Sequence, residues 1–337
     1  MKMNKLTAVA VALIASSPAF AGKLEEIRER GVLKCGVSTG VVGFSAPDAE
    51  GVWHGFDVGM CRAVAAATLG DPMAVEFIPQ TSKTRFSALA SGEIDMLSRT
   101  TTWTYSRDSD LKVEFAGVNF YDGQGFLVSN ELGVSGASEL DGATVCIKTG
   151  TTSELNLADY FRTNGMEFDP VPVEADAEAI QQLLAGSCDV FSTDSSKLNA
   201  HRASLENPDA YTILPDIISK EPLGPAVLHG DQQWGDIVRW TLNALLTAEE
   251  LGVTSENAAD MAANSSNPEV KRLLGTEGEL GGMLDMDPSW AQNAISAVGN
   301  YGELFDNTIG VNSPIGIERG QNALWTNGGL QYSPPFR

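Results

Sequence analysis

Three short polar segments carry the residue types that could bind a small charged molecule. Residues 98–107 read SRTTTWTYSR, a hydroxyl-rich loop that also contains two arginines. Hydroxyls can donate hydrogen bonds to a carboxylate, and the planar guanidinium group of an arginine can hold one through two contacts. Residues 148–152, KTGTT, precede a predicted helix, where backbone N–H groups and hydroxyls favour an anion. Asp194 comes just after the predicted strand at residues 189–193 and is placed to meet an ammonium group.

All three polar segments come directly after predicted β-strands. The expected strands are residues 32–38, 74–78, 94–98, 144–148, 168–173 and 189–193. The expected helices between and after them are residues 57–69, 83–91, 153–163, 177–185 and 196–205. This alternation predicts an α/β fold, with mostly parallel sheets flanked by helices. Ligands bind beyond the carboxyl ends of such strands, which is where the polar segments lie.

The alternation of strands and helices occurs in two blocks. The second begins near residue 130, and extended stretches at 123–129 and 223–229 flank it as natural crossings. A chain of 337 residues is also long enough for about two domains. We therefore expect a discontinuous lobe 1 (residues 22–126 and 226–337), which includes a helical and irregular C-terminal extension. Lobe 2 (residues 127–225) is expected to be inserted into it.

The charge of the chain excludes several classes of partner. It carries 22 Lys and Arg against 44 Asp and Glu, a formal net charge of −22. Such a polyanion repels nucleic-acid phosphates and anionic lipid headgroups, and no Lys/Arg-rich run offers a local exception. We therefore expect no nucleic-acid or membrane-surface partner, and a soluble monomer.

The first 21 residues have the pattern of a cleavable signal peptide. Lys2 and Lys5 precede an apolar run at residues 6–14, and the segment ends Ala19-Phe20-Ala21, an A-x-A cleavage pattern. The apolar run is shorter than the roughly 20 residues that a membrane span needs. An N-terminal core helix is the alternative, and export with removal of residues 1–21 is the prediction.

In an exported protein, the four cysteines would lie in a compartment that favours disulfides. Cys35, Cys61, Cys146 and Cys188 allow three disulfide pairings in an oxidising compartment. Pairing within each block gives Cys35–Cys61 and Cys146–Cys188, which we favour, with buried free thiols as the alternative. A zinc site is not expected, because no C-x-x-C spacing occurs and the chain has only three histidines.

Catalytic and cofactor motifs are incomplete in this sequence. Residues 36–40, GVSTG, match G-x-S-x-G, but a nucleophile elbow must turn directly into a helix. Residues 41–55 instead contain Pro47 and several glycines, which argue against a helix. No H-E-x-x-H, P-loop or complete G-x-G-x-x-G is present either. The sequence therefore predicts no catalytic residue, no metal and no cofactor.

Four longer stretches resemble a known protein family. They are residues 55–71 (GFDVGMCRAVAAATLGD), 84–108 (TRFSALASGEIDMLSRTTTWTYSRD), 147–161 (IKTGTTSELNLADYF) and 188–198 (CDVFSTDSSKL). The chain resembles the periplasmic amino-acid-binding proteins of ABC transporters (family 3 solute-binding proteins). Within these it is similar to the general L-amino-acid and glutamate/glutamine/aspartate/asparagine subgroup, also in its C-terminal extension. The resemblance implies the two-lobed type II periplasmic-binding-protein fold, a periplasmic location, an L-amino acid ligand and permease subunits as partners.

The resemblance also implies which residues bind the amino acid. The groups implied around its α-carboxylate are Arg107, Thr100, Thr102, Thr152, Thr151 and Gly150. Asp194 would take the α-ammonium group, from the lobe opposite to Arg107. A zwitterion held in this way would bridge the two lobes and bias a hinge toward closure.

Two further residues bear on the side chain of the ligand. The resemblance implies that Arg85 reaches a side-chain carboxylate or amide, and a solvated arginine at a helix start is the alternative. Phe44 is the only aromatic side chain that the first loop offers for stacking against a ligand. An enzyme on the same fold, such as a periplasmic cyclic-acid dehydratase, is the alternative function.

Overall fold

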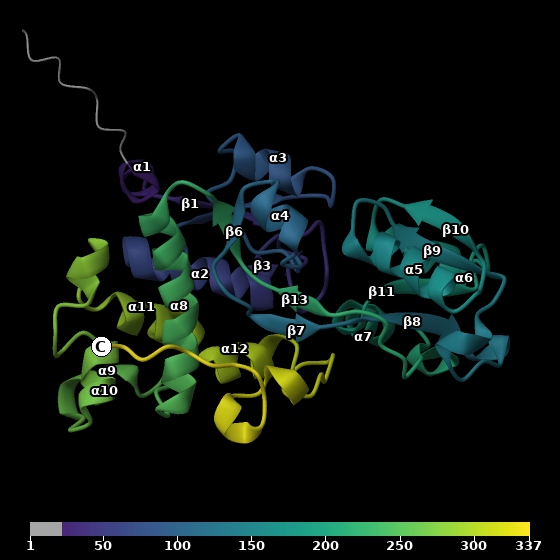
Figure 1. Ribbon diagram of the computed structural model, residues 1–337. Coiled ribbons are helices and arrows are strands. Elements are labelled where there is room, and N and C mark those ends of the chain that lie inside the picture. Colours follow the sequence, from purple (N-terminus) through teal and green to yellow (C-terminus); the bar gives the residue numbers. More distant parts are fainter. Residues whose placement is uncertain (1–21) are drawn as a thin grey trace, which may run out of the picture.

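The computed structural model describes residues 22–337, and the predicted signal peptide lies outside the described residues. Figure 1 shows two lobes, each built on its own β-sheet, which are joined by the strands β7 (Phe120–Asp122) and β13 (Glu221–Leu223). These two strands pair antiparallel and form a separate ribbon, called here the hinge ribbon. The two-lobed α/β fold predicted from the sequence is therefore present.

Lobe 1 contains a five-stranded sheet in the order β4-β1-β5-β14-β6. Its strands are β1 (Leu33–Val37), β4 (Val75–Pro79), β5 (Met96–Leu97), β6 (Val113–Phe115) and β14 (Ala226–Leu228). A small hairpin is formed by β2 (Ala46–Pro47) and β3 (Trp53–His54). β1 pairs parallel with β4 and β5, whereas β14 pairs antiparallel with β5 and β6. β14 is antiparallel to its neighbours because the chain returns from the hinge ribbon and enters the sheet from the opposite end.

Helices from distant parts of the chain cover lobe 1. Its N-terminal helices are α1 (Lys23–Arg30), α2 (Phe56–Leu69), α3 (Arg85–Ala90) and α4 (Tyr105–Ser109). The C-terminal extension adds α8 (Gln232–Glu250), α9 (Ala258–Asn264), α10 (Pro268–Leu273), α11 (Trp290–Val298) and α12 (Tyr301–Thr308). α2 packs against β1 on one side and against α8 and α11 on the other, so it is buried almost completely. At the end of the chain, Phe336 packs edge-on against Trp240 at 5.0 Å.

Lobe 2 contains a second five-stranded sheet in the order β10-β9-β11-β8-β12. Its strands are β8 (Gln124–Ser129), β9 (Ala143–Lys148), β10 (Phe168–Val173), β11 (Val190–Asp194) and β12 (Tyr211–Ile213). Its helices are α5 (Thr152–Thr163), α6 (Asp176–Leu184) and α7 (Ser195–Ala203). β9 pairs parallel with β10 and β11, and β8 pairs antiparallel with β11 and β12.

Side-chain alternation explains why helices cover both faces of the second sheet. Along β8, Phe126 and Val128 join one apolar cluster with Leu157 of α5. Leu127 points to the other face and joins a second cluster with Leu183 of α6. Successive side chains of a strand point to opposite faces, so a run of apolar residues buries both of them.

Each lobe contains one disulfide, which joins a strand of its sheet to a neighbouring segment. Cys35 of β1 is bonded to Cys61 of α2, and Cys146 of β9 is bonded to Cys188 just before β11. The pairing within each block, favoured from the sequence, is confirmed, and no cysteine in the described chain is free.

Candidate functional site

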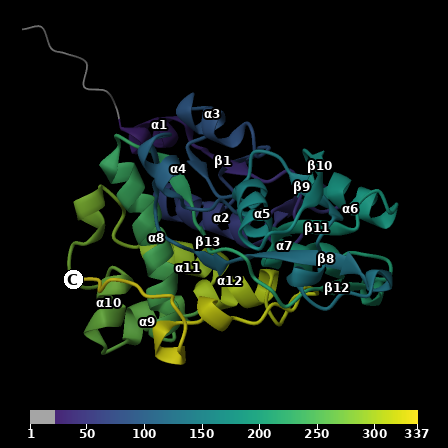
Figure 2. The ribbon, with the colours of Figure 1, turned by 45° about the vertical axis from the view of Figure 1, so that its right-hand side comes forward.

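Several of the predicted binding residues meet where the two lobes face each other across the hinge ribbon. The Thr102 hydroxyl oxygen, from the loop after β5, lies 3.4 Å from that of Thr152, the first residue of α5. Arg107 of α4 lies beside this loop, and its Nη1 donates to the Thr102 carbonyl oxygen at 2.8 Å. Residues of lobe 1 and lobe 2 therefore contribute to one polar constellation. Figure 2 shows the ribbons of the two lobes that supply them, with α4 in lobe 1 and α5 in lobe 2.

Arg107 is buried yet keeps its charge at neutral pH. Arg107 is 8% exposed, and its guanidinium carbon lies 5.3 Å from the centre of the Phe86 ring. Burial lowers the pKa of Arg107 to about 10, while the nearby Glu221 and Asp194 carboxylates favour its charged form. A buried guanidinium with carboxylates in its surroundings can bind an anion strongly, because little solvent screens the contact.

Thr100 is held in an unusual backbone conformation. Its φ is +39°, a region that non-glycine residues seldom occupy. The Asp57 carboxylate of α2 holds it there by accepting the Thr100 N–H at 3.0 Å and the Ser98 hydroxyl at 3.3 Å. The Thr100 hydroxyl is buried and has no partner among the described residues. Asp57 thus positions a loop that contains two predicted ligand contacts, a role that sequence reasoning did not identify.

We expect the stability of the protein to depend on pH through Asp57. Burial raises the pKa of Asp57 to about 6, from an ordinary value of 3.8. The folded protein binds this proton more tightly than the unfolded chain, so the unfolding free energy falls as pH rises from about 4 to about 6. Denaturant unfolding at pH 4.5 and pH 7 should show this fall in the wild type. Asp57→Asn should show a smaller fall, and an equal fall in both proteins would contradict the assignment.

Arg85 is a buried cation without a carboxylate partner in the described chain. It begins α3 and is 2% exposed, so it is not the solvated residue that the alternative interpretation required. Its Nη1 donates to the Thr101 hydroxyl at 3.3 Å, and its Nε is buried with no partner among residues 22–337. Burial, together with the charges of Arg99 and Arg107, holds the pKa of Arg85 well below its usual range. An anionic group nearby would relieve this repulsion.

Asp194 ends β11 on the opposite lobe and is 3% exposed. Its carboxylate lies 2.7 Å from the Lys197 ammonium nitrogen, one turn along α7. Asp122 of the hinge ribbon accepts hydrogen bonds from the backbone and the hydroxyl of Ser196. Burial and the neighbouring Asp194 carboxylate raise the pKa of Asp122. Asp194 is therefore a buried carboxylate that contacts a cationic side chain, Lys197.

Thr151 and Gly150 shape the start of α5. The Thr151 hydroxyl donates to the Lys148 carbonyl at 2.7 Å and accepts the Glu154 N–H at 3.4 Å, so it caps the helix. Gly150 has a φ of +72°, and a Cβ there would lie 3.4 Å from the side chain of Lys83 in lobe 1. These two residues orient the helix that presents Thr152.

Phe44 lies away from this constellation. Its ring is 1% exposed and packs edge-on against Phe56 at 6.4 Å and Phe120 at 5.7 Å, in the core of lobe 1. The prediction of a stacking contact with a ligand therefore finds no support in its position. The first loop folds back onto α2, since the backbone N–H groups of Asp57 and Val58 both donate to the Phe44 carbonyl.

Glu221 is the main residue of the constellation that sequence reasoning missed. It begins β13, is 1% exposed and accepts hydrogen bonds from Thr102 and from Thr152, which lies 3.0 Å away. The only signal in the sequence was its position two residues before the predicted crossing at 223–229. Its meeting with the two threonines depends on the path of the hinge ribbon.

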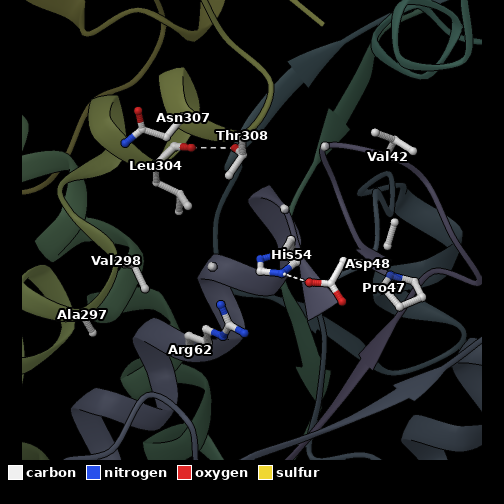
Figure 3. A pocket seen from close by; sticks show the side chains of 14 residues that line it. Val42, Pro47, Asp48, His54, Arg62, Ala297, Val298, Leu304, Asn307 and Thr308 are labelled. Atoms are coloured by element: carbon white, nitrogen blue, oxygen red, sulfur yellow. Dashed lines mark hydrogen bonds and ion pairs between the residues drawn. The ribbon is translucent and has the colours of Figure 1, made fainter. Parts of the chain in front are cut away.

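A separate cavity of about 480 Å³ lies in lobe 1, between the first loop and the C-terminal helices α11 and α12. Figure 3 shows the His54 imidazole pointing toward Asp48, at 2.8 Å, with Arg62 of α2 nearby. None of the residues predicted to bind a ligand lines this cavity.

No helix within 22–337 combines the length and the apolar character that a membrane span requires. The same stretch holds no group of three or more His, Cys, Asp or Glu that could bind a metal ion.

Comparison with known proteins identifies relatives over nearly the whole chain. The family model of the bacterial extracellular solute-binding proteins, family 3, matches residues 33–258. The glutamate/glutamine/aspartate/asparagine-binding protein BztA of Rhodobacter capsulatus is 55% identical, over 98% of this chain and 97% of its own length. The general L-amino acid-binding periplasmic protein AapJ of Rhizobium johnstonii is 52% identical over the full length of both chains.

A solved structure supports the same relationship. A periplasmic binding protein of an ABC transporter from Brucella ovis, described with glutathione bound, superposes with a TM-score of 0.92 at 51% identity. The match covers 94% of this chain and 100% of that one, so it includes the C-terminal extension.

Proposed function

Because this chain belongs to the bacterial extracellular solute-binding proteins of family 3, we propose that it captures L-amino acids and delivers them to an ABC importer. The observation that carries the proposal is the meeting of Arg107 and Thr102 of lobe 1 with Thr152 of lobe 2 at the hinge. A carboxylate bound there would contact both lobes at once.

The charges of the site fit a zwitterion. Arg107 would bind the α-carboxylate, with the unpartnered Thr100 hydroxyl as a further donor. Asp194 would bind the α-ammonium group from the opposite lobe. Since Arg107 and Asp194 lie on different lobes, the ligand itself would stabilise the closed arrangement. No step in this mechanism requires a nucleophile or a general base.

Calorimetric titration of the purified protein with each of the twenty L-amino acids tests the proposal. We expect at least one of them, most readily glutamate, glutamine, aspartate or asparagine, to bind with a Kd well below 1 mM. Failure of all twenty to bind below roughly millimolar concentration would refute it. Mass spectrometry of any solute that co-purifies with the protein gives an independent identification.

Glutathione belongs in the same titration. The Brucella ovis protein is described with it bound, and its γ-glutamyl end carries an α-ammonium and an α-carboxylate group like a free amino acid. We propose that the same donors would hold this end. Its second carboxylate, at the glycine end, would place further negative charge within reach of the buried arginines.

We expect Arg85→Ala to weaken the binding of glutamate and aspartate more than that of neutral amino acids. Arg85 is buried without a carboxylate partner in the described chain, so a side-chain carboxylate would be its natural counter-charge. Titration of the variant with glutamate and with alanine measures the difference. An equal loss for both ligands would contradict a role in side-chain recognition.

The proposal extends to location and assembly. The predicted signal peptide and the relative named as periplasmic support an exported protein that acts in the periplasm and meets permease subunits there. One chain supplies both sides of the site, which supports a monomer as the working unit.

The enzyme alternative, a cyclic-acid dehydratase, would need an acid–base pair in the cleft. The hinge ribbon does supply a buried glutamate, Glu221, but both of its oxygens accept hydrogen bonds from neighbouring side chains. Product analysis after incubation with candidate cyclic acids separates the two functions, and formation of a dehydrated product would favour the enzyme.

A further inference from the structure

The Glu221 carboxylate accepts hydrogen bonds from lobe 1, from lobe 2 and from the segment just before β13. Its Oε2 accepts hydrogen bonds from the Thr102 hydroxyl of lobe 1 and, at 3.0 Å, from the Thr152 hydroxyl of lobe 2. Its Oε1 accepts from Asn156 Nδ2 at 2.6 Å and from the Ser219 hydroxyl at 2.9 Å. The side chain therefore crosses from the hinge ribbon to the point where both lobes present their hydroxyls.

The two hydroxyls bound to Oε2 are those that the proposed function assigns to the carboxylate of the solute. A threonine hydroxyl has a single proton to donate. In the structure, Thr102 and Thr152 both donate that proton to Glu221. A solute carboxylate can receive hydrogen bonds from them only if Glu221 gives them up.

The surrounding positive charges favour a carboxylate at this position. The guanidinium groups of Arg85, Arg99 and Arg107 are all buried, and the charges of Arg99 and Arg107 disfavour the charged form of Arg85. Glu221 acts in the opposite direction on both Arg85 and Arg107. It is thus a resident counter-charge for a cationic cluster that an anionic solute would otherwise neutralise.

We infer that Glu221 limits the affinity of the site, because its carboxylate competes with the carboxylate of the solute for the Thr102 and Thr152 hydroxyls. This inference rests on the proposed function and adds to it a residue that no sequence motif indicated. Binding then includes the transfer of two hydroxyl donors from Glu221 to the solute. The two negative charges also repel each other in a site that solvent screens poorly. Tight binding therefore needs the α-ammonium group of the solute beside its carboxylate.

Glu221→Gln tests the competition directly. Glutamine keeps the size of the side chain and one acceptor oxygen, but it removes the negative charge and one of the two acceptor oxygens. We expect calorimetric titration to show L-glutamate binding at least about tenfold more tightly to Glu221→Gln than to the wild type. Unchanged or weaker binding would overturn the inference, since it would mean that the charge of Glu221 does not oppose the solute.

A second variant keeps the inference testable if Glu221→Gln folds poorly. Ser219→Ala removes one donor from Oε1 and leaves both threonines and the charge of Glu221 in place. A less firmly held carboxylate competes less well, so we expect glutamate to bind about two- to fivefold more tightly. Binding no tighter than that of the wild type would overturn the inference.

Titration of the wild-type protein distinguishes a failure of the proposed function from a failure of the competition by Glu221. If it binds none of the twenty L-amino acids, the proposed function fails. If it binds glutamate and neither variant binds more tightly, only the competition by Glu221 fails. Circular dichroism of each ligand-free variant confirms that a folded protein was titrated.

Discussion

Arg107→Ala should reduce the affinity for every L-amino acid that the protein binds, by roughly 30-fold to several thousand-fold. Truncating one partner of a buried, hydrogen-bonded charge pair costs about 2–5 kcal/mol, and each 1.4 kcal/mol is about tenfold in Kd. Arg107 is 8% exposed, so water cannot readily replace the lost guanidinium. The solute carboxylate would be left to hydroxyl donors alone, two of which are already bound to Glu221.

Two comparisons make the Arg107 result specific. Arg107→Lys keeps the charge but loses the two-pronged geometry, so we expect an intermediate loss of affinity. Arg162→Ala removes an exposed arginine of lobe 2 that forms an ion pair with Asp159, one turn away, and should leave binding unchanged. Calorimetric titration of all three variants with the same amino acid gives the comparison. Wild-type affinity in Arg107→Ala would refute the assignment of Arg107 to the carboxylate.

Asp194→Asn should reduce amino-acid affinity by about 100-fold or more. The substitution preserves the shape of the side chain and removes the negative charge that would face the α-ammonium group. The Lys197 ammonium, 2.7 Å from the carboxylate in the wild type, would then lie beside the ammonium group of the solute without compensation. The loss should therefore exceed that of one neutral hydrogen bond, which is typically about 0.5–1.5 kcal/mol.

The Asp194 variant also breaks a buried ion pair, so it needs a matched control. Asp176→Asn breaks the other buried Lys–Asp pair of lobe 2, in which Lys148 lies 2.6 Å from Asp176. Both variants should lose stability, because each leaves a buried ammonium group unpaired. Only Asp194→Asn should lose affinity when both are titrated under conditions where they are folded. Equal affinity losses would indicate a general effect on lobe 2 in place of a contact with the solute.

Local patterns along the chain predicted the elements that carry the site. The repeated alternation of strands and helices gave both sheets, and the halves of that pattern paired Cys35 with Cys61 and Cys146 with Cys188. Such signals can be read from sequence because periodicity and helix ends depend on near neighbours. The same logic located residues 98–107 and Thr152 at strand ends, where the structure brings Thr102 and Thr152 within 3.4 Å.

Packing between distant segments decided the rest of the candidate site. Phe44 looked available because it lies in a glycine-rich loop, but that loop folds onto α2 and buries the ring against Phe120. The sequence places Asp57 at the start of a helix and gives no sign of a further role. In the structure, the loop after β5 brings the Thr100 N–H to its carboxylate. In both cases the partner is more than 40 residues away, so no local pattern could indicate the contact.

The amino-acid sequence by itself determined the α/β class, the two blocks and the polar segments at the strand ends, and it favoured the disulfide pairing that the structure shows. Each of these follows from residue types and their spacing over a few turns of helix or one strand. Only the tertiary structure showed that Glu221 meets Thr102 and Thr152, which lie 119 and 69 residues away along the chain. That meeting depends on the antiparallel pairing of β13 with β7 and on the approach of the two lobes. The contacts of the Glu221 carboxylate come from separate segments of the chain, so they exist only once those segments have folded together.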